Sequence, residues 1–80
     1  MNVEIEGDVV RKLVGAGTKS EHMAVVLVTT DGRELTLRRL GGNAFQDPEL
    51  ESLIGQKIKG AGEIIAGATF LMKTYAVATG

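Results

Sequence analysis

Residues 23–40 read MAVVLVTTDGRELTLRRL, two runs of aliphatic and β-branched residues on either side of Asp31-Gly32. An Asp-Gly pair favours a two-residue hairpin turn, because both central positions of that turn need positive φ. Such a turn also fixes the register of the two strands, so that Val28 should face Leu35. The core face predicted by this register consists of Val26, Val28, Leu35 and Leu37.

The opposite face of this hairpin carries more apolar surface than a solvated strand face usually does. Val25 and Leu27 lie on that face, and Thr36 lies beside them on the next strand. Because a contiguous exposed apolar patch marks an interaction surface, we expect Val25, Leu27 and Thr36 to form a protein interface. The alternative is that the curvature of a barrel strand turns one of the two aliphatic side chains into the interior.

A short helix is expected after the hairpin. Asp47 is a good cap, Pro48 suits the first helical position and Gly55 is the expected stop. Phe45 precedes the cap and is the fourth candidate interface residue. It either folds back on Leu50 or Ile54 to close one end of the core, as a hydrophobic staple does, or it anchors a partner.

Three more strands complete the predicted secondary structure. Residues 3–14 begin with alternating apolar and acidic positions, and Gly7 marks the bend that a strand needs when it serves two sides of a small barrel. Residues 15–20 read as a glycine-rich loop. Residues 57–65 and 68–77 are expected to pair as a second hairpin.

The elements therefore follow the order strand, strand, strand, short helix, strand, strand, which is an all-β pattern with one short helix. This order, with the helix between the third and fourth strands and a long glycine-bent first strand, resembles the OB-fold. The run from Leu50 to Gly62 is similar to the passage from the helix to the fourth strand in many OB domains. The resemblance implies one five-stranded OB-like barrel over residues 1–80; the alternative is an SH3-like barrel.

The whole chain also resembles small uncharacterised bacterial proteins. Two stretches carry this resemblance: Lys-Ser-Glu-His at residues 19–22 and Arg-Arg-x-Gly-Gly-Asn-x-Phe at residues 38–45. The resemblance covers most of the chain and implies no function.

The small size of the chain bears on its partners. A domain of about this length buries only about 60% of the surface that its unfolded chain exposes, so it needs disulfides, a structural metal or self-association. The 80 residues include no cysteine and a single histidine, His22, which leaves self-association. No run reaches the roughly 18 apolar residues that span a membrane, and a basic signal-peptide start is missing. We therefore expect a cytoplasmic homo-oligomer, or a complex with another protein, without a membrane.

Nucleic acid is the second kind of partner to consider. Arg38, Arg39 and Lys59 could form a basic stripe that follows a single-stranded backbone. The formal net charge is −1, however, and neither strand of the first hairpin contains an aromatic residue on which a base could stack. Cross-strand ion pairs with glutamates also explain why basic residues occur on these strands.

Catalysis is the third hypothesis. Ser20, Glu21 and His22 have the residue types of a hydrolase triad, but neighbours in an extended segment point to alternate faces. The glycines at 15–20 lack the spacing of a phosphate loop, and a β-rich run follows where a helix is needed. The sequence thus predicts a non-catalytic module that acts through protein contacts and self-associates, with no catalytic residue, cofactor or metal. The alternative is a single-stranded nucleic-acid or polyanion binder, and a small hydrolase ranks third.

Overall fold

A computed structural model describes residues 2–15, 17–19, 21–42 and 47–78. Its strands are β1 (Val3–Val14), β2 (His22–Thr29), β3 (Glu34–Arg39), β4 (Lys57–Ile65) and β5 (Thr69–Val77), and its helix is α1 (Pro48–Ser52), which lies between β3 and β4 in the chain. The prediction of a mainly β chain with one short helix is confirmed.

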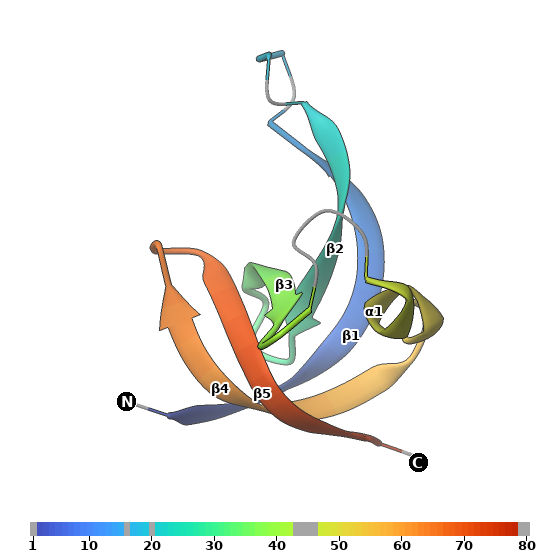
Figure 1. Ribbon diagram of the computed structural model, residues 1–80, viewed down its shortest axis with the longest axis vertical. Coiled ribbons are helices and arrows are strands. Elements are labelled where there is room, and N and C mark those ends of the chain that lie inside the picture. The colour runs from blue at the N-terminus through green and yellow to red at the C-terminus, as the bar shows by residue number, and fades with distance from the viewer. Residues whose placement is uncertain (1, 16, 20, 43–46, 79–80) are drawn as a thin grey trace.

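The five strands form one sheet that closes into a ring in the order β1-β2-β3-β5-β4 (Figure 1). Neighbouring strands are antiparallel except for β3 and β5, which run parallel. The long β1 closes the ring, because it pairs with β4 from Val3 to Asp8 and with β2 from Gly7 to Val14. Gly7 lies where the two pairings overlap, as expected for a strand that serves two sides.

The interior of the ring is filled with aliphatic, methionine and phenylalanine side chains. Phe70 and Met72 of β5 and Ile58 of β4 are fully buried, and α1 contributes Leu50 to the same cluster. Alternation along each strand places these residues on the inner face and sends their neighbours outward. The complete buried cluster is Ile5, Val9, Leu27, Leu35, Leu37, Leu50, Leu53, Ile58, Phe70 and Met72.

The predicted register of the β2–β3 hairpin is wrong by one residue. Leu27, and not Val28, pairs with Leu35, and Val26 pairs with Thr36. Because side chains alternate, this shift exchanges the two faces of β2. Leu27 is fully buried inside the ring, whereas Val28 is half-buried on the outside.

The loop that joins β2 to β3 explains the shift. It has three residues between the paired Thr29 and Arg33, with Gly32 at φ 91° as expected for the glycine of the turn. The N–H of Thr29 donates to the carbonyl of Arg33 at 2.8 Å, and the N–H of Arg33 donates to the Thr29 hydroxyl at 2.9 Å. The same hydroxyl donates to the Asp31 carboxylate. The Thr29 side chain thus stabilises a three-residue loop. The preference of Asp-Gly for a two-residue turn does not take this interaction into account.

The shift also corrects the expected interface. Leu27 lies in the core, and Val25 is half-buried and packs against the core cluster. Neither side chain belongs to an outer patch. Thr36 does lie on the outer face, half-buried beside Val26, and Phe45 lies outside the described residues.

Candidate functional site

β1 and β2 continue beyond the ring as a two-stranded projection, clear at the top of Figure 1. β4 leaves β1 after Val9, whose N–H donates to the carbonyl of Gln56 at 2.9 Å. On the other side of the projection, the pairing of β2 with β3 begins at Val26 and continues toward the loop. Residues 11–14 and 22–25 therefore have register partners only in each other within the described part of the chain, and we call these two segments the arm. They contribute to a long axis of 37 Å, against 27 and 26 Å for the other two.

One face of the arm, which we call its apolar face, carries Val25, Leu13 and Met23 beside one charged residue, Arg11, and is uncovered at its end. Leu13 faces Met23 directly across the two strands, and these side chains are 50% and 55% exposed. Val9 and Leu27 lie on the same face, each four positions closer to the ring along its strand, and both are fully buried. On β2 the core-facing series of Leu27 and Val25 thus continues to Met23, and on β1 Leu13 resumes the series of Val9 beyond Arg11. An isolated two-stranded hairpin is marginally stable in water, so this face needs a cover that the described chain does not supply.

Two ion pairs hold the base of the arm. Arg11 Nη2 lies 2.7 Å from Glu51 Oε1 of α1, and Lys12 Nζ lies 2.8 Å from Glu34 Oε1 of β3. Lys12 aligns with Ala24 of β2, and Glu34 aligns with Val28, so the Lys12–Glu34 ion pair crosses the outer face above Val26. This cover explains why Val26 is only 3% exposed although its side chain points outward. Exposed pairs of this kind contribute about 0–1 kcal/mol each, so they orient the arm without covering its end.

A second uncharged surface crosses the outside of the ring. The register aligns its members in one row across all five strands: Val10, Val26, Thr36, Thr69 and Ile65. Only Ile65 among them is more than a third exposed, at 37%. The row offers a partner much less free apolar area than Leu13 and Met23 do, and the arm is therefore the stronger candidate site.

The three basic candidates do not form one stripe. Arg38 is exposed on the outer face of β3, opposite Leu71 of β5. Lys59 is exposed on β4 and lies opposite Glu6 of β1. Arg39 is on the inner face and reaches toward α1. Arg38 and Lys59 thus share the outer face, but β5 lies between their strands and Lys59 is four residues from Glu63, the β4 residue in the row of Arg38, while Arg39 lies on the other face.

Arg39 fastens α1 to the ring. Its Nε lies 3.1 Å from Asp47 Oδ2 and 3.2 Å from Glu49 Oε2, and its side chain is 31% exposed. Asp47 also caps α1 by accepting from the N–H of Glu49 at 3.1 Å, as predicted. Burial acts to raise the pKa of Asp47, but the hydrogen bonds from Arg39 and from the Glu49 amide outweigh burial and hold that pKa below its ordinary value. The hydrogen bond to Asp47 in turn raises the pKa of Arg39.

Asp47→Asn should make folding stability less sensitive to acid. A depressed carboxyl pKa stabilises the fold at pH values above the unfolded value, here 3.8, and the effect is lost as the pH falls through the folded pKa. We expect the variant to be less stable than wild type at pH 7 by about 1 kcal/mol, because Arg39 is partly solvated, and the difference should shrink below pH 4. Urea unfolding at several pH values measures this, with Asp8→Asn as an exposed control. Parallel pH profiles for Asp47→Asn and wild type would contradict the assignment.

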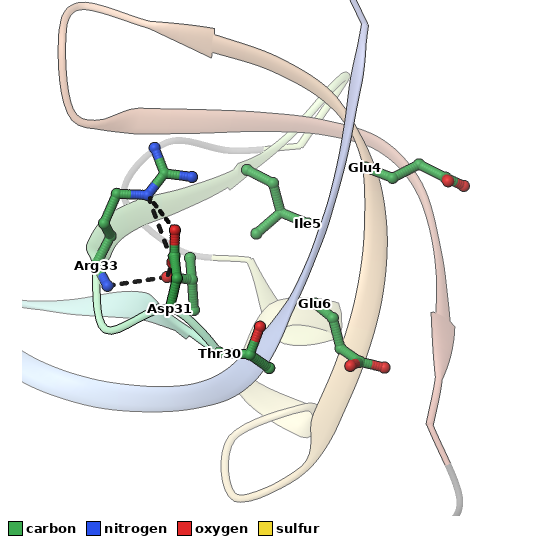
Figure 2. Close-up of a pocket in the computed structure, with 7 residues that line it drawn as sticks. Glu4, Ile5, Glu6, Thr30, Asp31 and Arg33 are labelled. Atoms are coloured by element: carbon green, nitrogen blue, oxygen red, sulfur yellow. Dashed lines mark hydrogen bonds and ion pairs between the residues drawn. The ribbon is translucent and has the colours of Figure 1, made fainter.

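A shallow pocket of about 200 Å³ lies between the start of β1 and the β2–β3 loop. Figure 2 shows Glu4 and Glu6 on one side of it and the Asp31–Arg33 ion pair on the other, with the two glutamates pointing away from that pair. The hydrogen bond from the Thr29 hydroxyl lowers the pKa of Asp31, and Arg33 lowers it further. Thr29, Asp31 and Arg33 of the lining bind one another within the β2–β3 loop, where the Thr29 hydroxyl and the Arg33 guanidinium both donate to the Asp31 carboxylate.

The remaining sequence candidates bring no further chemistry together. His22 is exposed at the arm, and Ser20 lies outside the described residues. Within the described ranges no group of three or more histidine, aspartate or glutamate side chains is placed to hold a metal ion. None of the described residues forms a helix long and apolar enough to cross a membrane.

Comparison with known proteins adds no relative: no family model matches the chain, and neither curated proteins nor solved structures show a significant match. The site is therefore defined by its own geometry. Sequence reasoning missed Leu13 and Met23, although a signal was present. Leu13 resumes the odd-numbered inner series of Ile5 and Val9 after Arg11, on a strand of 12 residues that extends beyond its partners in the ring.

Proposed function

We propose that this chain is a non-catalytic protein-interaction module that self-associates through the apolar face of its arm. The observation that carries the proposal is the directly paired Leu13 and Met23, the most uncovered aliphatic pair on the described strands. Complete burial of such a side chain contributes about 1.5–3 kcal/mol, so covering two half-exposed ones contributes roughly as much as one. That is a useful addition for a chain of 80 residues without a disulfide.

An OB-like architecture is part of the proposal. Two features support it over an SH3-like ring: the helix between β3 and β4, and a long β1 that pairs with both β2 and β4 around Gly7. OB-folds bind oligonucleotides and oligosaccharides on the face of their second and third strands and on adjoining loops, and the second and third strands here carry no aromatic residue on which a base could stack. The dispersed positions of Arg38, Arg39 and Lys59 favour a protein partner over a nucleic-acid strand.

The double variant Leu13→Ser with Met23→Ser should weaken self-association. It removes the exposed apolar pair and leaves the ring intact, because both side chains are outside the buried core cluster. We expect the dissociation constant to rise by roughly 10–100-fold, the equivalent of about 1.4–2.8 kcal/mol. Sedimentation equilibrium measures the change, and circular dichroism verifies that the sheet remains.

Ile65→Ser is the matched control, because Ile65 is also an exposed aliphatic residue but lies on β4 in the outer row. It should leave the dissociation constant unchanged. If Ile65→Ser weakened the assembly and the double variant did not, the outer row would be the interface and the proposal for the arm would be wrong.

A further inference from the structure

Met23 and Met72 are the two methionines that the structure describes, and their surroundings are opposite. Met23 is 55% exposed on the apolar face of the arm, whereas Met72 is fully buried inside the ring. Met1 lies outside the described residues. A methionine thioether is oxidised where an oxidant can reach its sulfur. The sulfur of Met23 is therefore open to modification in the monomer, and the sulfur of Met72 is protected.

The side chains around Met23 cannot bind a polar group. Leu13 lies directly across the two strands, and Val25 lies on the same face two positions along β2. Neither of these side chains has a hydrogen-bond donor. Arg11 is the charged residue of this face, and its guanidinium lies 2.7 Å from the Glu51 carboxylate of α1, at the base of the arm. A polar group created on Met23 would thus lack a partner once the face is covered.

We propose that Met23 is a redox-sensitive modification site, and that its oxidation to the sulfoxide by a peroxide weakens self-association. This inference rests on the proposed function and adds its regulation. With hydrogen peroxide, the O–O bond breaks, one oxygen forms a bond to Sδ of Met23 and the other oxygen leaves as water. The sulfur loses the two electrons that the peroxide gains. A thiol-dependent methionine sulfoxide reductase reverses the step, because two thiols become a disulfide and the oxygen leaves as water.

The sulfoxide changes what the arm can bury. It turns a flexible apolar side chain into a polar one whose oxygen accepts hydrogen bonds from water in the monomer. The assembly would place that oxygen against Leu13 and Val25, and burying an acceptor without a donor opposes association. Because the chain contains no cysteine, oxidation of a thiol in the chain cannot produce the same response.

Treatment with increasing hydrogen peroxide, followed by tryptic peptide mapping, tests the site. Cleavage after lysine and arginine separates the three methionines onto residues 1–11, 20–33 and 60–73, so mass spectrometry follows each of them separately. We expect Met23 to be oxidised at peroxide levels that leave Met72 reduced. Sedimentation equilibrium of that sample should show a dissociation constant higher by roughly 10-fold or more. Methionine sulfoxide reductases with dithiothreitol should restore the original value.

Met23→Leu is the matched control, because it removes the sulfur and keeps an apolar side chain of similar volume. Its dissociation constant is measured before and after the same peroxide treatment, and the two values should agree. If peroxide weakened the assembly of Met23→Leu as much as that of wild type, another group would carry the effect and the inference would be wrong.

The remaining outcomes separate this inference from the proposed function. If oxidised Met23 leaves the dissociation constant unchanged while the Leu13→Ser, Met23→Ser variant raises it, the arm is the interface but Met23 does not regulate it. Oxidation of Met72 as fast as that of Met23 would also overturn the inference, because the exposed site would then have no selectivity. If the reduced wild-type chain does not self-associate at all, both the inference and the proposed function are wrong.

Discussion

Leu27→Ala is expected to reduce the free energy of unfolding by about 2–5 kcal/mol, the largest effect of any change considered. Leu27 is fully buried, pairs with Leu35 and belongs to the cluster that fills the ring. Removing its branched side chain leaves a cavity that the closed sheet has little freedom to collapse. Since a domain of this kind has about 5–15 kcal/mol of stability in total, urea unfolding should show a large shift in midpoint.

Val28→Ala is the matched comparison on the next residue of the same strand. Val28 lies on the outer face and is half-buried, so its truncation should cost less than about 1 kcal/mol. The two variants discriminate between registers, since a two-residue turn would place Val28 inside and Leu27 outside. A larger loss of stability from Val28→Ala than from Leu27→Ala would show that the register described above is wrong.

Gly7→Val should have the second largest effect, at or above the upper end of the roughly 1–3 kcal/mol that overpacking costs. Gly7 is buried where β1 pairs with Thr29 on one side and Ile58 on the other. A Cβ atom there would lie 2.3 Å from the Val28 carbonyl oxygen and 2.8 Å from its carbon. These are backbone atoms, so no side-chain rotation relieves the contact and a strand must move.

Thermal or urea unfolding followed by circular dichroism measures this loss. Asp8→Val is the control, because Asp8 is the exposed neighbour on the same strand and a β-branched residue is favourable there. Equal stability of the two variants would mean that β1 does not approach β2 as closely at Gly7 as the structure indicates.

The sequence predicted the elements well because their signals are local. Asp47 and Pro48 mark the start of α1, and Gly32 and Gly55 have the positive φ expected at a turn and after a helix. Each of these positions depends on the conformation of only a few neighbouring residues. The mainly β class follows from the same short-range patterns.

Register and exposure could not be predicted in the same way. The one-residue shift of β2 against β3 depends on the Thr29 hydroxyl, whose bonds to Arg33 and Asp31 arise only in the folded loop. The role of Arg39 depends on Asp47, eight residues away across a segment without a strong pattern. Whether Leu13 is covered depends on where β4 leaves β1, which no local pattern in the sequence of β1 reports.

Self-association through the arm is the central claim, and the native mass of the wild-type chain tests it most directly. Sedimentation velocity from low to high micromolar concentration should show a shift from 8.4 kDa toward twice that mass. The Leu13→Ser, Met23→Ser variant should remain near the monomer mass over the same range. A wild-type protein that sediments as a monomer at every concentration would contradict the account.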